Sequence, residues 1–454
     1  MSNKFYKFAD LPPNPFDRQD LKDYRDLGAN VCLLTEDDVD LVKDGKLSED
    51  YKQAIRNIAD AGLQVWIRNM YNDEEYFQCD YHKHGENYGD AYEMEPRNIT
   101  DEFQEFPAVT GFYMADEAYM YTLPEKWEVG FMQDMQADKH IEKYASFDKL
   151  TKLVDWKNAH YPDAFFHMNH VPGQSWDHFV PRNGEIYDYE DFLTAYCDII
   201  LRRLKGCKRS LCLDNYPFIG EDYIEYDYLK DFMTAAKVWR AYNASVAEED
   251  KAVLGFCVQT FHAKALFDDR HRDITMSEEV SLQIFTGMAV GARLFEYFLY
   301  RSYRDEMIGI KGPDGQKRIF DIVQEGIHRT EPFEEVLSQF EAYGAFVAPG
   351  ELRTENTKAF VQLKDLVVKE DALTVHPEYD AVIGCFTNGE QKGYMLVNYT
   401  DPILKHTSRM TLQFADANSA TIYLDNEVQT VALENGTCTI TLTPGNAAFV
   451  VPEK

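Results

Sequence analysis

The stretch Val109-Thr-Gly-Phe-Tyr-Met-Ala-Asp-Glu117 is an apolar run that ends in two adjacent carboxylates. Because the side chains of a β-strand alternate between its two faces, one face of this stretch is predicted to carry mostly small side chains and to end in a polar residue. The other face is predicted to carry bulky side chains. This division is typical of a buried parallel strand whose inner face narrows toward a site. The inner face would hold Gly111, Tyr113, Ala115 and Glu117, and the outer face Phe112, Met114 and Asp116.

Similar apolar runs occur on both sides of this stretch and alternate with segments of helical periodicity. Eight strands that alternate with helices favour a closed (β/α)8 barrel, a TIM barrel, over an open sheet. In such barrels the active site lies at the carboxyl ends of the strands. The expected strands are 5–8, 29–35, 63–69, 109–115, 164–170, 210–217, 253–262 and 292–300.

A helix over residues 316–345 is expected to close the barrel, and the sequence then changes character. From about residue 355 it shows short alternating segments broken by turns, as in 394–399, 408–414 and 437–442. Such segments are typical of antiparallel sheets. We therefore predict two domains, a (β/α)8 catalytic barrel over 1–350 and a C-terminal antiparallel β-sandwich over 355–454.

The composition excludes several classes of partner. Lys and Arg number 46 against 78 Asp and Glu, a formal charge of −32, which argues against binding nucleic acid or an anionic membrane. The eight cysteines show no metal-ligand spacing, and Cys32, Cys212 and Cys257 fall in apolar runs, so reduced buried thiols are expected. With no apolar leader and no apolar run of about 18 residues, a cytoplasmic protein is expected.

The same alternation, applied to each strand, predicts which side chains converge at the barrel mouth. The inner face of each strand is taken as the one that carries small or polar residues. Carboxylates, an arginine, amides, a histidine and aromatic rings would then meet in one cavity. They are Trp66, Arg68, Tyr113, Glu117, His167, Asn169, Cys212, Asp214, Tyr216, Gly255, Cys257, Gln259, Phe261, Glu296, Phe298 and Tyr300, and Asp116, on the outer face, is a further candidate for binding the substrate.

This mixture suits a sugar. Pyranose faces stack on aromatic rings, and sugar hydroxyls bind carboxylates, amides and guanidinium groups. Cleavage of a glycosidic bond needs one protonated and one ionised carboxyl group, and crowded carboxylates supply that split in pKa.

Simpler interpretations remain for each carboxylate. Asp116 could cap a helix, Asp214 could shape a turn, and Glu296 could pair with a buried arginine. The histidines are expected to form ordinary hydrogen bonds, so no metal or cofactor is predicted.

The chain resembles bacterial (β/α)8 glycoside hydrolases of the β-galactosidase and cellulase-like superfamily. The resemblance covers nearly the whole chain, including the trailing β-sandwich. In that superfamily a Glu that closes the fourth strand is commonly the acid/base, which corresponds to Glu117. The matching stretches are 109–117, Leu213-Asp-Asn-Tyr-Pro-Phe218 and Phe285-Thr-Gly-Met-Ala-Val-Gly-Ala-Arg-Leu-Phe-Glu-Tyr-Phe298.

The chain departs from this superfamily at the seventh strand, where a Glu is commonly the nucleophile. Here that position is Gln259, which cannot attack an anomeric carbon. The second carboxylate could come from another strand, with Asp214 and then Glu296 as candidates, or the strand count could be off by one. Other barrel hydrolases pair carboxylates of the fourth and sixth strands, which fits Glu117 or Asp116 with Asp214.

The leading hypothesis is a glycoside hydrolase that acts on small oligosaccharides, with Glu117 as general acid and Asp214 or Glu296 as base or nucleophile. The remaining mouth residues would bind the sugar. The alternatives are a sugar-binding barrel without catalysis, and a metal-dependent hydrolase or isomerase built on Asp116, Asp214 and the histidines. The sequence leaves the oligomeric state open.

Overall fold

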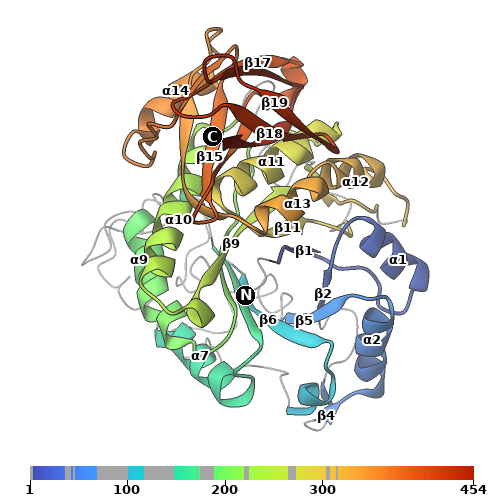
Figure 1. The fold of residues 1–454 in the computed structure, drawn as a ribbon. Helices are drawn as coiled ribbons and strands as arrows, with labels where there is room; N and C mark the ends of the chain where they lie inside the picture. The colour runs from blue at the N-terminus through green and yellow to red at the C-terminus, as the bar shows by residue number, and fades with distance from the viewer. Residues whose placement is uncertain are drawn as a thin grey trace, which may run out of the picture.

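The structure is a computed structural model of the 454-residue chain. It describes residues 4–35, 42–43, 46–68, 101–116, 148–170, 172–173, 189–218, 224–263, 272–302, 307–312 and 315–454. Glu117 lies outside these residues. Figure 1 shows the strands of the barrel in the centre, with helices around them and the C-terminal sheets on one side, next to α11.

Eight parallel strands form one sheet in the order β1-β11-β9-β8-β7-β6-β5-β2. The two strands at the ends of this order meet at Asn30, whose backbone N–H donates to Lys7 O at 2.9 Å and whose side-chain Oδ1 accepts from Lys7 N at 3.0 Å. The predicted barrel of eight strands is therefore confirmed, and β9 is its seventh strand. The strands are β1 (Tyr6–Ala9), β2 (Val31–Leu34), β5 (Gln64–Arg68), β6 (Val109–Asp116), β7 (Phe165–His170), β8 (Arg209–Leu213), β9 (Ala252–Gln259) and β11 (Leu294–Phe298).

Helices cover the outside of the barrel. Asp17 caps α1 through bonds from Gln19 N and Asp20 N, and Ser48 caps α2 through Tyr51 N, as expected of short oxygen-bearing side chains at helix starts. The helices are α1 (Arg18–Asp26), α2 (Glu49–Asp60), α7 (Asp148–His160), α9 (Tyr189–Ile199), α10 (Tyr226–Ala244), α11 (Ser277–Val290), α12 (Phe320–His328) and α13 (Glu331–Leu337).

The single helix predicted over 316–345 is wrong. Pro332 lies in the first turn of α13, where a proline is tolerated, whereas the interior of a continuous helix would lose a hydrogen bond at that residue. The chain therefore forms two short helices, α12 and α13. It then enters strand β13 (Glu341–Ala348), which pairs with β15 of the C-terminal sheets.

The C-terminal region contains an antiparallel sheet of six strands, β13-β15-β16-β21-β18-β19, and one of three, β14-β17-β20. Their apolar faces share one core that includes Ile383, Leu396 and Leu412, so the predicted β-sandwich is confirmed. A short helix, α14 (Asn356–Phe360), precedes β14. The strands are β14 (Leu373–Pro377), β15 (Ala381–Thr387), β16 (Lys392–Asn398), β17 (Ser408–Phe414), β18 (Ser419–Leu424), β19 (Glu427–Ala432), β20 (Thr437–Leu442) and β21 (Ala447–Glu453).

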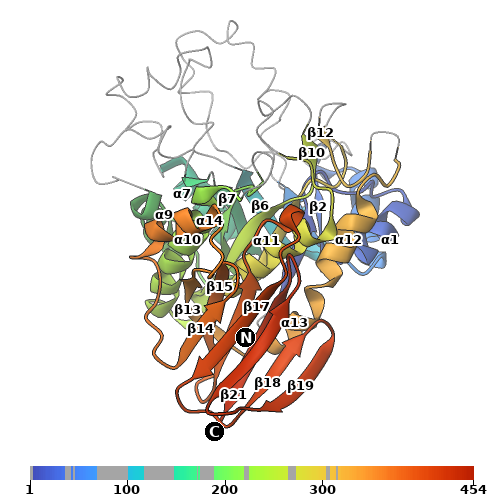
Figure 2. The same cartoon turned by 90° about the horizontal axis from the view of Figure 1, so that it is seen from above.

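Helix α11 joins the two parts of the molecule, because every one of its residues except Glu278 is buried. Gly287 lies so close to Phe256 and Phe295 on the barrel side that a Cβ there would meet both rings within 3.2 Å. On the other side a Cβ on Gly384 of β15 would come 2.1 Å from Ala289 O. The sandwich therefore packs directly on a helix of the barrel. Figure 2 shows it extending away from the end that carries the short strands β10 (His262–Ala263) and β12 (Met307–Ile308).

Candidate active site at the carboxyl end of the barrel

The interior of the barrel changes from apolar to polar along its axis. Near the amino ends it is filled by a cluster that includes Tyr6, Trp66, Phe165 and Leu294. Trp66 stacks on Phe165 with ring centroids 4.5 Å apart and is fully buried. Trp66 faces inward as predicted, but it lies deep among these side chains. Towards the carboxyl ends the interior side chains become polar.

A buried polar cluster is centred on His167 of β7. His167 Nδ1 lies 2.8 Å from Ser210 Oγ, and its Nε2 faces Glu296 Oε2 at 3.5 Å. Burial is the main cause that lowers the pKa of His167 well below its usual value, and electrostatic contributions from His170 and Arg68 act in the same direction. The ring is therefore neutral, and the contacts fit a tautomer in which Ser210 donates to Nδ1 and Nε2–H faces the carboxylate.

Glu296 of β11 lies beside Cys257 of the neighbouring strand, whose thiol faces Glu296 Oε2 at 3.5 Å. Asn169 Nδ2 donates to the same sulfur at 3.2 Å. Burial raises the pKa of Cys257 well above that of a free thiol, and the charges of Glu296 and Asp214 act in the same direction. Cys257 is thus a neutral thiol in contact with one of the predicted carboxylates, Glu296.

Arg68 and Tyr113 extend this cluster towards β1. The Arg68 guanidinium lies 4.9 Å from the centroid of the Tyr113 ring, and that ring lies 4.5 Å from the ring of His167. Arg68 also forms a buried ion pair with Asp10, which directly follows β1. Asp10 was not predicted, although it follows the same rule of a carboxylate after an apolar strand that singled out Glu117.

Three aromatic rings lie next to each other at the ends of β8, β9 and β11. Tyr216 meets Phe261 edge to face with centroids 5.1 Å apart, and it lies 5.8 Å from Phe298. Phe261 is fully buried, whereas Tyr216 and Phe298 are half-buried. Tyr216, Phe261 and Phe298, all predicted to face the barrel mouth, are therefore together.

Gln259 and Tyr300 each have the polar end of their side chain bonded elsewhere in the protein. The carboxamide of Gln259 accepts from Phe218 N at 3.3 Å and donates to Arg272 O at 2.8 Å, which ties together two loops beside β9. Tyr300 is buried against α1, where its hydroxyl donates to Asp20 Oδ1 at 2.8 Å. Each of these side chains thus has a partner within the protein at its polar end.

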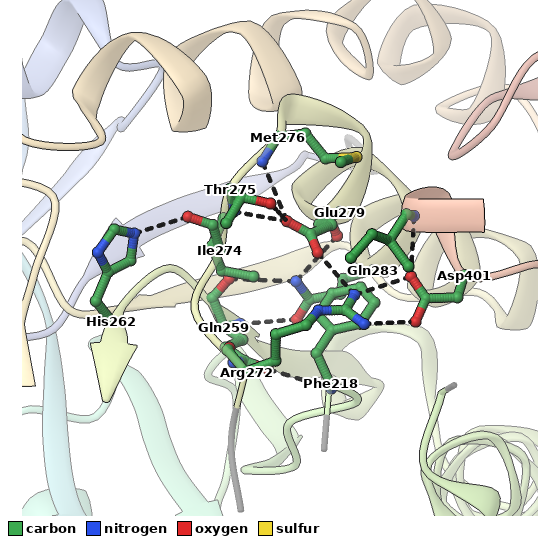
Figure 3. Close-up of polar contacts among 11 residues, drawn as sticks. Phe218, Gln259, His262, Arg272, Ile274, Thr275, Met276, Glu279, Gln283 and Asp401 are labelled. Carbon is green, nitrogen blue, oxygen red and sulfur yellow. Dashed lines mark hydrogen bonds and ion pairs between the residues drawn. The ribbon is translucent and has the colours of Figure 1, made fainter. Parts of the chain in front are cut away.

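Gln259 belongs to a polar network that connects the barrel with the sandwich (Figure 3). Arg272 donates to both carboxylate oxygens of Asp401 at 2.7 and 2.8 Å and to Glu279 Oε1 at 2.7 Å. Glu279 in turn accepts from the backbone N–H groups of Thr275 and Met276 at the start of α11. No feature of the sequence indicated Arg272, because its partners lie on segments far apart in the chain.

The regular alternation predicted for β6 is wrong at its end. The register with β7 shifts between Tyr113 and Ala115, so that Ala115 pairs with Met168 and Asp116 with Asn169. Such a bulge adds a residue on one strand and breaks the period of two. The argument that assigned Glu117 rather than Asp116 to the inner face assumed a regular strand. The roles of this carboxylate pair stay predictions.

One group of metal-ligand type occurs among the described residues. His167, Cys212 and Glu296 offer donor atoms that all lie within 4.8 Å of one another. Nitrogen, sulfur and oxygen donors of this kind suit zinc, with bonds of about 2.0–2.3 Å. The metal-dependent alternative named Asp116, Asp214 and the histidines, and only His167 belongs to both sets.

The described cysteines are free, and all but the half-buried Cys438 are buried. The buried positions predicted for Cys32, Cys212 and Cys257 are confirmed. Among the described residues, no helix is both long and apolar enough to cross a bilayer.

Comparison with solved structures identifies the same architecture in glycoside hydrolases. A catalytic mutant of a GH42 β-galactosidase from G. stearothermophilus matches 100% of this chain and 99% of its own, with a TM-score of 0.51 and 8% identity. A structure described as a glycoside hydrolase matches 99% of this chain and 93% of its own, with a TM-score of 0.51 and 13% identity. The chain has the fold of these enzymes, a (β/α)8 barrel followed by a β-sandwich.

No protein-family model matches the chain, and no curated protein is similar to it in sequence. The resemblance to (β/α)8 glycoside hydrolases is thus confirmed at the level of the fold.

Proposed function

We propose that the protein is a glycoside hydrolase that acts on small oligosaccharides at the carboxyl end of its barrel. The observation that carries this proposal is that Asp214, directly after β8, and Glu296, on β11, belong to the end of the barrel that also carries the aromatic group of Tyr216, Phe261 and Phe298. Carboxylates next to aromatic rings fit a pyranose, because its hydroxyls bind the former and its apolar faces stack on the latter.

Glu117 is assigned as the general acid that protonates the leaving oxygen, and Asp214 as the ionised partner. Asp214 follows β8 directly, is half-buried, and has its backbone N–H bonded to His170 O at 2.8 Å. Glu296 is only 1% exposed and faces His167 and Cys257. A sugar therefore reaches Asp214 more readily, and Glu296 is assigned a positioning role through His167.

Arg68, Asn169 and Tyr216 would hold sugar hydroxyls. A guanidinium and an amide offer donors in fixed directions, and neither changes its charge near neutral pH. Tyr216 adds a hydroxyl beside the apolar rings. The neutral His167 would keep the Glu296 carboxylate in place without adding a positive charge to the site.

The test is turnover of nitrophenyl α- and β-glycosides and of plant and mucin oligosaccharides by wild type, Glu117→Gln and Asp214→Asn. Removing either catalytic carboxyl group should lower kcat on unactivated substrates by about 10²–10⁴-fold, the usual contribution of a general acid or base. Glu296→Gln should lower it less. Wild-type turnover that both Glu117→Gln and Asp214→Asn leave unchanged would contradict the proposal.

A second candidate, a sugar-binding barrel without catalysis, is favoured by Gln259. It occupies the end of the seventh strand, and both ends of its carboxamide bond to the protein. This candidate predicts saturable sugar binding without released product, and the same binding by Asp214→Asn. Released product that disappears in Asp214→Asn would exclude it.

A further inference from the structure

A cavity lies at the amino-terminal end of the barrel, opposite the candidate active site. It has a volume of about 410 Å³ and is bounded by the starts of β9 and β11, the residue before β8, the last turns of α10 and strand β13 of the sandwich. This volume lies within the range of small-molecule sites, about 300–1,000 Å³. None of the residues assigned to the candidate active site lines it.

The walls of this cavity are rich in positive charge, although the chain as a whole has a formal charge of −32. Its lining includes five cationic residues, Lys4, Lys208, Arg240, Lys251 and Arg293, and two carboxylates, Glu248 and Glu341. Both carboxylates lie against Lys251, at 2.6 and 3.8 Å. Arg293 donates to the carbonyl oxygens of Leu337 and Phe340.

Lys4 and Lys208 share one aromatic ring. Their ammonium groups lie 5.8 and 5.6 Å from the centroid of Tyr6, and Lys208 Nζ donates to the Tyr6 hydroxyl at 2.9 Å. Partial burial, followed by repulsion from Lys208, lowers the pKa of Lys4. A negative group between the two ammonium groups would relieve this repulsion.

Arg240, in the last turns of α10, is one of the cations that line the cavity. Its Nη1 is buried and has no hydrogen-bond partner among the described residues. Burial also lowers the pKa of the guanidinium. A buried donor on a charged group is costly to leave unbonded, so native proteins satisfy nearly all such groups. An oxyanion in the cavity would supply the opposite charge to the Arg240 guanidinium, which lines it.

We propose that this cavity binds a small organic oxyanion with at least two negative charges, held by Arg240, Lys208 and Lys4. Guanidinium groups bind phosphate, sulfate and carboxylate oxygens through paired hydrogen bonds, and ammonium groups add charge without a fixed geometry. Trp239 and Tyr343 also line the cavity, and they form walls against which the carbon skeleton of the ligand packs.

The experiment is titration calorimetry of the full chain with sodium phosphate, sodium sulfate and sodium citrate, against sodium chloride at matched ionic strength. The wild type should bind at least one of the three in a saturable manner. Arg240→Gln and, separately, Lys208→Gln should weaken this binding at least 10-fold. Binding of citrate alone assigns a polycarboxylate, whereas equal binding of phosphate and sulfate assigns a tetrahedral oxyanion.

The matched control is Lys237→Gln. Lys237 lies on the same helix, outside the cavity lining, and pairs with Glu190 at 2.7 Å. The Lys237→Gln variant loses one positive charge from α10 and should bind the anion with wild-type affinity. The proposal is overturned if none of the three anions binds beyond the chloride control. It is also overturned if Arg240→Gln and Lys208→Gln, both folded by circular dichroism, bind as tightly as Lys237→Gln.

Discussion

Two cations at the amino end of the barrel differ in their partners from two arginines near its carboxyl end. Near the carboxyl end, Arg68 pairs with Asp10, and Arg272 pairs with Asp401 and Glu279. At the amino end, Lys208 bonds to a tyrosine hydroxyl, and Arg240 Nη1 has no partner among the described residues. In an acidic chain, carboxylates are plentiful enough to pair with every cation. Arg240 and Lys208, which have no carboxylate partner among the described residues, therefore point to a ligand, whereas Arg272, bound between two buried carboxylates, points to a structural role.

Arg272→Leu tests whether the paired arginine near the carboxyl end stabilises the fold. This change leaves Glu279 and Asp401 buried without their shared cation, and breaking such a buried pair typically costs about 3–5 kcal/mol. We expect a loss of this size in the free energy of unfolding, measured by urea denaturation. Arg202→Leu, which removes an exposed pair with Asp198, should cost less than about 1 kcal/mol. Equal losses in the two variants would contradict the structural role.

The stability of the carboxyl end should depend on pH, because buried histidines lie in the carboxyl half of β7. Burial lowers the pKa of His170 to about 3, whereas an unfolded histidine titrates near about 6.5. The unfolded state thus binds the extra proton first, and stability falls as pH decreases. His170 alone should cost about 1.4 kcal/mol between pH 7.5 and 5.5.

His170→Gln should remove this part of the pH dependence, measured by urea denaturation at both pH values. His376→Gln, at an exposed histidine of β14, should keep the wild-type dependence. If His170→Gln keeps the full dependence, His170 is not a neutral buried ring.

The smallest expected change in the free energy of unfolding is that of a variant at the amino end, Arg240→Leu. In chloride buffer without other anions, Arg240→Leu should change the free energy of unfolding by less than about 1 kcal/mol, because it removes a buried donor that has no partner there. Arg209 is the matched contrast, since it is fully buried and donates to three carbonyls and to Asp250. Arg209→Leu should cost at least about 3 kcal/mol. Similar losses in the two variants would show that Arg240 is also structural.

The sequence predicts the order of strands and helices well, because each strand of this barrel is a short apolar run between helical segments. Single-strand alternation also places His167, Asn169 and Glu296 on the inner face, where they meet. Arg272 could not be predicted in this way, since Asp401 lies 129 residues away in the chain. Long-range partners of this kind are set by how α11 and the sandwich pack, which no local pattern contains.

Local rules also failed where the backbone departs from a regular period. The bulge in β6 shifts the register after Tyr113, and nothing in an alternating apolar stretch reveals where an extra residue is inserted. Pro332 is a different case, because it can be read in the sequence. A proline at this position disfavours one long helix over 316–345. Tyr300 was placed by alternation beyond the end of β11, where the strand rule no longer applies.

The burial of α11 has a consequence for synthesis on the ribosome. The helix is complete at Val290, but the sheet that covers its outer side begins with Glu341 and ends at Glu453. At translation rates of about 5–20 residues per second, the nascent chain holds an uncovered apolar helix for about 8–33 seconds before Glu453 is added. During this interval it is a target for chaperones, and a truncated chain that lacks the sandwich would keep that target permanently.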